Sequence, residues 1–290
     1  MDRTINVRFF SIENFEGDQT SFADCLRQAA RPNLSDREVE IEEGIVIRLE
    51  RLRAIAPSML AGQFVRIQSE NLPPRAIRGR HLETLGVPSI GHTAAFRYDV
   101  ARSTIALQLG HNGITAARLS MYMQSLLTVE GFRILPVITD DAWEKLGSGR
   151  VRKIMLRIAR PQELHAAVPE HRSVRSGFQA MKEAAQTTYV EVSLGMGHAD
   201  TDISTNRVRR MFEWLIHERS EERAGISKLA AVIRDDATDE TEVLTFLDAH
   251  MGERTKLTLP DDPDRAYRII DQYITAVLAK RRREINARRP

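Results

Sequence analysis

The stretch that decides the fold spans residues 44–68 and reads GIVIRLERLRAIAPSMLAGQFVRIQ. Residues of high strand propensity lie on both sides of Pro57-Ser58, so the stretch predicts two strands, Gly44–Ile55 and Leu60–Gln68, joined by a turn. Strands joined by a short turn pair antiparallel, because a parallel pair needs a crossover of about a dozen or more residues. A sheet that is at least partly antiparallel is therefore expected.

The rest of the chain mixes strand-like and helical patterns without strict strand–helix–strand alternation. A second hairpin is predicted at Ala94–Tyr98 and Thr104–Leu109, and a helix over Thr115–Thr128. The last helix begins with Asp262 as its N-cap and Pro263 at its first position. This mixture predicts an α+β fold with mixed or antiparallel sheets, interspersed helices and a long C-terminal helix.

Length and composition bound the domain organisation. The 290 residues are enough for one large domain or for two of about 150 residues each. Fractions of 42% hydrophobic and 28% charged residues are typical of a folded globular protein and exclude a disordered tail or a collagen-like fibre. The proline- and charge-rich stretch 161–172 predicts a boundary between an N-terminal α+β region, 1–162, and a C-terminal α+β region, 163–290, which ends in a basic helix.

The sequence also indicates the compartment. No run approaches the ~18–20 consecutive apolar residues of a spanning helix, and Met1–Phe10 carries charges where a signal peptide would be apolar. Cys25 is the only cysteine, which excludes an internal disulfide and a cysteine zinc cluster. It shares the apolar stripe of a predicted short helix with Phe22 and Leu26, so we expect a buried structural thiol. A cytoplasmic location is expected.

No catalytic or cofactor motif stands out. The eight histidines lack metal-ligand spacing, and there is neither a Gly-x-Ser-x-Gly elbow nor a complete phosphate-binding loop. No catalytic residue, cofactor or metal site is therefore predicted, and a non-enzymatic role is favoured. One alternative is a metal-dependent nuclease that uses Asp200, Asp202 or Glu191, although Glu191 lacks the lysine expected two positions on. Another is a protein-interaction subunit whose arginines pair with an acidic partner.

Arginine dominates the cations, with 36 arginines among 42 cations, against 40 acids. Its planar guanidinium suits phosphates and carboxylates better than the lysine ammonium does. The codon bias of a GC-rich genome explains the same excess equally well. The positions of the arginines therefore matter more than their number.

Four basic clusters are candidates for phosphate contacts. The first is a loop after Pro73-Pro74, and the second is a strand over Arg150–Arg160, on which alternate side chains share a face. One face has Arg152, Ile154, Leu156, Ile158 and Arg160, and the other has Lys153, Met155, Arg157 and Ala159. An edge strand that binds nothing would show the same pattern.

The third cluster lies on a predicted helix over Ser204–Arg219, where Arg207, Arg210 and Trp214 project away from the core stripe. A tryptophan beside arginines can stack on a ligand or form a protein interface. A tryptophan tucked under a neighbouring loop is an equally weighted alternative. The fourth cluster is the end of the terminal helix from Lys280 onward, which exceeds what the helix dipole requires; a solvated basic tail is its alternative.

These clusters give a set of predicted nucleic-acid contacts. The contacts are Arg75, Arg78, Arg80, Arg152, Lys153, Arg157, Arg207, Arg210, Lys280, Arg281, Arg282 and Arg283. We expect them to converge on one electropositive surface, where each neutralised phosphate releases counterions and makes binding depend on salt. The expectation fails for side chains already bound to a carboxylate of their own molecule.

The order and spacing of the elements carry a resemblance to a known family. The elements concerned are the hairpin Phe96–Leu109, the helix Thr115–Thr128, the strand Phe132–Ile138 with Leu135-Pro136, the basic strand Val151–Arg160, the acidic turn Asp235–Glu240 and the terminal helix ending in Lys280–Arg283. In this arrangement the chain resembles the RexA-like phage exclusion proteins. The resemblance covers most of the chain and lies in pattern and spacing.

The resemblance implies a function in abortive infection, a form of antiviral defence. RexA-like proteins are two-part α+β DNA-binding dimers, related in fold to the recombination-associated protein RdgC, and they act with a membrane-channel partner. By this resemblance the chain is expected to form a homodimer that binds duplex DNA through backbone phosphates, with little sequence readout. A membrane-protein partner encoded nearby is also expected, no catalytic residue is implied, and the interaction subunit of the alternative would belong to a defence complex.

Overall fold

The computed structural model divides the chain into two compact units, residues 1–134 with 252–290, and residues 135–251. It describes residues 2–14, 20–110, 112–127, 132–165, 168–197, 199, 201–220, 224–234, 241–247 and 249–287. The second unit is one continuous segment inserted into the first. The boundary expected between residues 162 and 163 falls inside the second unit, where Pro161–Glu163 forms a short 3₁₀ turn, η3, between two elements of that unit. The acidic turn 235–240 lies outside the described residues.

An antiparallel sheet of eight strands forms the centre of the first unit, and its strand order is β12-β1-β6-β5-β4-β3-β2, with β7 paired to β1. The strands are β1 (Asp2–Asn14), β2 (Val39–Glu42), β3 (Ile45–Ala56), β4 (Met59–Gln68), β5 (Ile90–Asp99), β6 (Thr104–Leu109), β7 (Phe132–Pro136) and β12 (Gly252–Thr258). The pairings β3–β4 and β5–β6 confirm both predicted hairpins. The short 3₁₀ turns are η1 (Ser35–Arg37) and η2 (Val100–Arg102).

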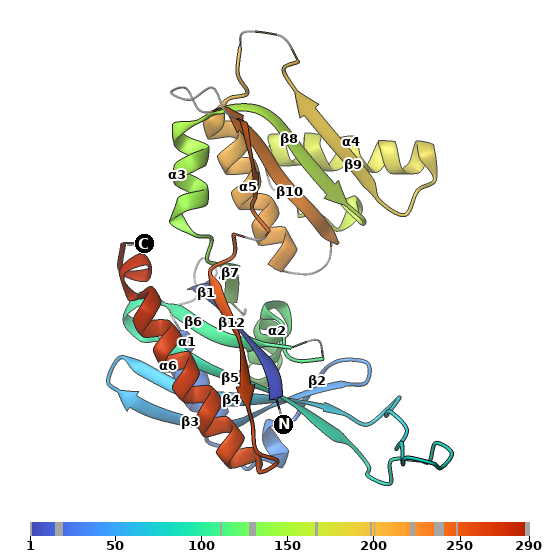
Figure 1. Ribbon diagram of the computed structural model, residues 1–290, viewed down its shortest axis with the longest axis vertical. Helices are drawn as coiled ribbons and strands as arrows, with labels where there is room; N and C mark the ends of the chain where they lie inside the picture. The colour runs from blue at the N-terminus through green and yellow to red at the C-terminus, as the bar shows by residue number, and fades with distance from the viewer. Residues whose placement is uncertain are drawn as a thin grey trace. The chain divides into compact units, whose positions relative to one another are not determined.

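Helices cover both faces of this sheet. The helices α1 (Phe22–Ala29) and α2 (Ala116–Leu127) lie on one face, and α6 (Pro263–Ala287) crosses the other (Figure 1). Along β5, Phe96 and Tyr98 belong to the core beneath α1 and α2, whereas the alternate residue Arg97 points to α6. Cys25 on α1 is fully buried, as predicted.

The long terminal helix α6 is held by ion pairs as well as by its apolar stripe. Asp262 caps its first turn, as predicted, with Oδ1 accepting from the backbone N–H of Arg265 at 2.7 Å. Asp271, only 3% exposed, accepts two hydrogen bonds from Arg97 at 2.8 and 2.9 Å and a further one from Arg53. These contacts anchor the middle of α6 to β3 and β5.

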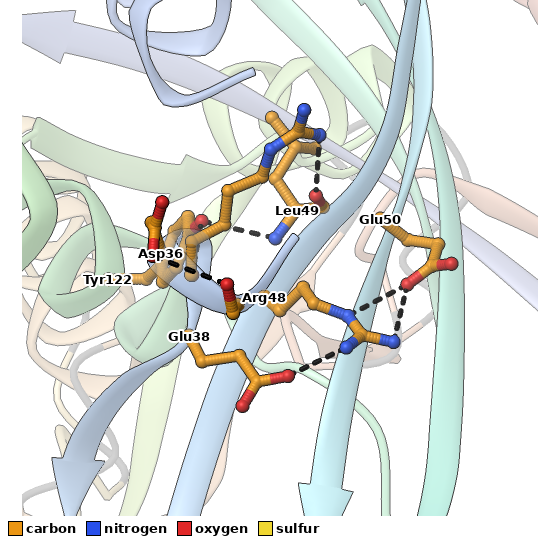
Figure 2. A network of polar contacts seen from close by, with 8 residues as sticks. Asp36, Glu38, Arg48, Leu49, Glu50 and Tyr122 are labelled. Carbon is orange, nitrogen blue, oxygen red and sulfur yellow. Dashed lines mark hydrogen bonds and ion pairs between the residues drawn. The ribbon is translucent and has the colours of Figure 1, made fainter. Parts of the chain in front are cut away.

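A polar network ties α2 to the sheet on the opposite side. The hydroxyl of the fully buried Tyr122 accepts from the backbone N–H of Leu49 at 3.1 Å and donates to the carbonyl of Arg37 at 3.0 Å (Figure 2). Burial raises the pKa of Tyr122 to about 12. Nearby, Arg48 bridges Glu38 and Glu50.

The second unit is a four-stranded antiparallel sheet, order β11-β10-β8-β9, with helices on one face. Its strands are β8 (Arg150–Ile158), β9 (Val190–Gly195), β10 (Ile226–Arg234) and β11 (Thr241–Thr245), and its helices are α3 (Asp140–Ser148), α4 (Pro169–Ala185) and α5 (Thr205–Ser220). One core, built from the three helices and one side of each strand, holds the unit together (Figure 1). The α+β prediction is therefore confirmed for the chain.

Helix α4 differs from its predicted form. The sequence pattern predicts a helix capped by Ser173, with Val174, Phe178, Met181 and Ala185 on its apolar stripe. The helix instead begins at Pro169, because a proline at the first position needs no hydrogen-bond acceptor for its nitrogen. The Ser173 hydroxyl instead donates to the carbonyl of Pro169 at 3.1 Å. Of the predicted stripe, Phe178 is buried, whereas Met181 is half exposed. Among the described residues, no helix is long and apolar enough to cross a membrane.

Candidate nucleic-acid interface

Strand β8 lies in the middle of the four-stranded sheet and separates two different surfaces. Ile154, Leu156 and Ile158 are buried beneath the helices. The alternate residues Lys153 and Arg157 project from the other side of the sheet, as the sequence predicted. No described helix packs on that side (Figure 1).

The strand register identifies the rest of this surface, which we call the open face. Directly paired residues of antiparallel strands project to the same side, and Lys153 pairs with Val232, while Arg157 pairs with Lys228 and Glu191. The open face consists of Arg150, Lys153, Met155, Arg157, Lys228, Ala230, Val232, Arg234, Glu191, Ser193, Thr241, Val243 and Thr245. It therefore contains five cations and one carboxylate, and one of the cations, Arg150, is also paired through Nε with Asp202 Oδ2 at 3.7 Å.

The one carboxylate organises two of the cations. Glu191 accepts from Lys228 Nζ at 2.5 Å and from Arg157 Nε at 2.7 Å. The hydrogen bond from Lys228, and then that from Arg157, lowers the pKa of Glu191 below its ordinary value. The Arg157 guanidinium also lies 5.0 Å from the ring centroid of Tyr189, which is 49% exposed. Two cations share one carboxylate, so this cluster keeps a net positive charge beside an exposed aromatic ring.

Lys153 and Arg152 have different roles although they are neighbours. Lys153 is exposed, and no ion pair of its ammonium is described. Arg152 lies at a register shift between β8 and β10, and its guanidinium donates to the carbonyls of Gly197, Ala199 and Thr201 and to Asp202 at 2.8–3.1 Å. The guanidinium of Arg152 therefore holds the segment after β9 in place, and we exclude Arg152 from the predicted nucleic-acid contacts.

The predicted basic loop lies in the first unit, between β4 and β5. Arg75, Arg78 and Arg80 are exposed there, and none of their guanidinium groups is paired with a carboxylate of the described chain. The backbone of Arg75 pairs with that of Glu83, so the segment folds back on itself. In Figure 1 this connection projects from one end of the sheet, at the opposite end from the C-terminal turn of α6.

Two of the four cations at the basic end of α6 are bonded to carboxylates of the first unit. Lys280 and Arg281 both bond to Glu253 of β12 at 2.8 Å, and Arg281 also bonds to Glu284. These two predicted contacts thus hold α6 in place. Arg282 and Arg283 are exposed, and residues 288–290 lie outside the described part of the chain.

The predicted cluster on α5 is only partly outward-facing. Trp214 is 8% exposed, donates from Nε1 to the carbonyl of His165 at 3.0 Å and stacks on His171, which confirms the alternative of a tucked tryptophan. Arg207 and Arg210 are exposed and line a pocket between α4 and α5. That pocket lies on the helical side of the sheet, so these arginines do not join the open face. In the second unit, these arginines and the cations of the open face lie on opposite sides of the sheet. In the first unit, the basic loop and the end of α6 lie at opposite ends of the sheet. The expectation that all the cations of a unit converge on one surface is therefore wrong.

The open face includes cations that the sequence interpretation did not select. Lys228 and Arg234 lie on β10, whose sequence ISKLAAVIR alternates between the core and the open face. The alternation of side chains along β10, like that along β8, predicts that both cations lie on the same side of the strand. The place of Tyr189 beside Arg157 depends on the β8–β9 pairing, which strand alternation alone does not reveal.

The two described acids of the nuclease alternative are paired with cations. Glu191 binds Arg157 and Lys228, and Asp202 binds Arg152 and Arg150. Asp200 lies outside the described residues. Among the residues that are described, no three histidine, cysteine, aspartate or glutamate side chains gather where a metal ion would bind. Comparisons with protein-family models and with curated protein sequences find no match to this chain.

Proposed function

We propose that the chain binds DNA, without catalysis and with little sequence readout, through the open face of the second unit. The observation that carries the proposal is the placement of five cations and one carboxylate on a sheet surface that no described helix covers. Lysine and arginine side chains contact phosphates, which are the same at every base pair. Binding through them gives affinity with little dependence on sequence.

The arrangement of the cations supports contact with a phosphate backbone. Lys153, Arg157 and Lys228 lie on neighbouring strands, which are about 4.8 Å apart in a sheet. They therefore present charge both along β8 and across to β10. A phosphate that approaches Arg157 or Lys228 would replace Glu191 as acceptor, so the cluster is already positioned for an anion.

Two observations bear on whether the bound DNA is duplex or single-stranded. Duplex DNA is the form that the resemblance to the phage exclusion proteins implies. Tyr189 offers a ring on which an unpaired base can stack, which is the usual device of single-strand binders. A Tyr189→Ala variant distinguishes the two forms: for a duplex binder we expect unchanged affinity, and for a single-strand binder a weaker affinity.

The biological setting of this activity is proposed from the resemblance alone. We place the DNA binding in a phage exclusion system, with a homodimer as the binding species and a membrane protein as partner. Sedimentation of the purified chain tests the dimer. Plating efficiency of phage on cells with and without the gene tests the defence role.

Fluorescence anisotropy with a labelled duplex, titrated at several salt concentrations, tests the DNA contact. The slope of log K against log salt falls by about 0.9 for each phosphate that the protein no longer neutralises. We expect the Lys153→Ala/Lys228→Ala variant to lower this slope by about 2 and to weaken binding. The matched control, Arg265→Ala/Arg268→Ala, removes the same charge from exposed positions of α6 that are not among the predicted contacts, and it is expected to keep the slope.

Three outcomes would contradict the proposal. One is the lack of binding at low salt, and another is an unchanged slope in the Lys153/Lys228 variant. The third is cleavage of the DNA in magnesium that disappears in Asp200→Ala, which would favour the nuclease instead.

A further inference from the structure

A second feature of the inserted unit is a pocket of about 760 Å³ between the first turns of α4 and the first half of α5. Pockets that hold small-molecule ligands measure about 300–1,000 Å³. Its lining comes from the two helices, on the side of the sheet away from the open face. The pocket is therefore a separate feature from the proposed DNA contact.

Two arginines give the pocket its anion-binding character. Arg207 and Arg210 are three residues apart on α5, so they lie on the same side of the helix. Both are exposed, and neither guanidinium has a carboxylate partner among the described residues. Two adjacent guanidinium groups supply forked donors that match the oxygens of a phosphate group.

A stacked pair of rings adds a place for a planar group. The His171 ring lies against that of Trp214, with centroids 4.1 Å apart and planes 6° from parallel. The Trp214 ring is held in place by its hydrogen bond from Nε1 to the carbonyl of His165. His171 also lines the pocket together with the apolar side chains of Val174 and Met211. A flat ring that enters the pocket can extend the existing stack.

From these contacts we infer that the pocket binds a nucleoside phosphate. The phosphate lies between Arg207 and Arg210, and the base stacks on His171 against the apolar wall. Glu170, on the same rim, accepts from an exocyclic amino group, which favours adenine over uracil. The other carboxylate of the rim, Glu213, is bonded to Arg209 at 3.0 Å, so its charge is offset.

The ligand has two possible sources with the same chemistry. It is either a free nucleotide or the phosphorylated end of a nucleic-acid strand. The inference does not depend on DNA binding at the open face, because none of the pocket residues belongs to that face. Failure of either proposal leaves the other intact.

Calorimetric titration of the full chain with AMP tests the inference. We expect one site, weaker binding of UMP, and no detectable binding of adenosine, which lacks the phosphate. The Arg207→Ala/Arg210→Ala variant is expected to bind AMP about tenfold more weakly for each guanidinium removed. The matched control is Arg265→Ala/Arg268→Ala, which removes two exposed arginines with the same spacing from α6 and is expected to bind AMP like the unmodified chain.

A second readout places the ligand in the pocket. In a Trp143→Phe background the fluorescence reports Trp214 alone, and AMP is expected to change it. Displacement of AMP by a 5′-phosphorylated oligonucleotide, but not by its 5′-hydroxyl form, would assign the site to strand ends; no displacement would assign it to the free nucleotide. Absence of binding up to about 5 mM AMP, or equal binding by the Arg207/Arg210 variant, would overturn the inference.

Discussion

At the scale of single residues, the open face depends on Glu191. This carboxylate accepts from Lys228 and Arg157, and these hydrogen bonds lower its pKa below the ordinary value. It holds both cations in position, but it also competes with phosphate for the same donors. Replacing the Glu191 carboxylate therefore shows whether positioning of the cations or competition with phosphate has the larger effect on DNA binding.

The first prediction concerns this competition. Glu191→Gln keeps the size of the side chain and removes its charge, so we expect duplex DNA to bind several-fold more tightly at low salt. The control is Glu242→Gln, which breaks an ion pair with Lys145 away from the open face. Anisotropy titrations measure both variants. Unchanged binding by Glu191→Gln would show that DNA does not contact this face, and weaker binding would contradict the predicted competition.

The second prediction concerns Tyr122. Tyr122→Phe leaves the Leu49 N–H and the Arg37 carbonyl without their partner in a buried site. We expect the free energy of unfolding to fall by about 1–3 kcal/mol. Urea titration measures it, with the exposed Tyr189→Phe as control, expected to lie within about 0.5 kcal/mol of the unmodified chain. Equal stability of the two variants would exclude a structural role for the Tyr122 hydroxyl.

The third prediction follows from His171. Burial, and then the nearby His165, lowers the pKa of His171 below 6.5, while Glu170 acts in the opposite direction. Arg207 and Arg210 line the same pocket from α5. A histidine with a lowered pKa contributes stability above its unfolded pKa, and this contribution disappears as pH falls through the folded pKa.

We therefore expect the urea midpoint of the chain to fall between about pH 7 and pH 5, with a smaller fall in His171→Gln. Quenching of Trp214 fluorescence by the protonated ring should follow the same pH range in the Trp143→Phe background. An identical pH profile for both chains would contradict the burial of a neutral His171.

At the scale of elements, the sequence was informative where the chemistry is local. The hairpin at Pro57-Ser58, the Asp262 cap and the buried stripe of α1 all depend on neighbouring residues, and all three are confirmed. The role of Arg152 depends on a β-bulge and on a loop more than forty residues away. Tertiary contacts of this kind leave no periodic signal in the sequence. The burial of Trp214 depends on such a contact, its hydrogen bond to the carbonyl of His165, so the sequence alone does not predict it.

The fourth prediction concerns how α6 is attached. Asp271→Asn leaves Arg97 and Arg53 without their shared buried carboxylate. We expect the free energy of unfolding to fall by about 3 kcal/mol, because breaking a buried ion pair strands its partner's charge. The control Asp264→Asn breaks the exposed pair with Arg51, which is worth about 0–1 kcal/mol. Equal effects of the two variants in urea titrations would show that Asp271 is not a buried anchor.

At the scale of the whole molecule, the second unit is an insertion whose two ends meet. The backbone N–H of Met251 donates to the carbonyl of Val137 at 2.6 Å, and that of Thr139 donates to the carbonyl of Ala249 at 2.8 Å. The unit also has its own core. Composition could not reveal this organisation, because the chain crosses between the units at Ile134 and Gly252 without a proline-, glycine- or serine-rich linker.

The fifth prediction is that residues 135–251 fold alone. We expect this fragment to unfold cooperatively in urea and to bind duplex DNA with nearly the affinity of the full chain. Circular dichroism and anisotropy measure the two properties. A folded fragment that does not bind would move the DNA contact to the first unit, where Arg75, Arg78 and Arg80 are the candidates.

The six lysines provide the most direct test of the open face. Lys153 and Lys228 lie on it, whereas Lys145, Lys182, Lys256 and Lys280 lie elsewhere. Brief acetylation of the full chain with and without duplex DNA, followed by mass spectrometry, compares all six in one sample. We predict that DNA slows the modification of Lys153 and Lys228 and leaves the other four unchanged. Unchanged rates at Lys153 and Lys228, with slower modification of Lys256 or Lys280, would contradict the account.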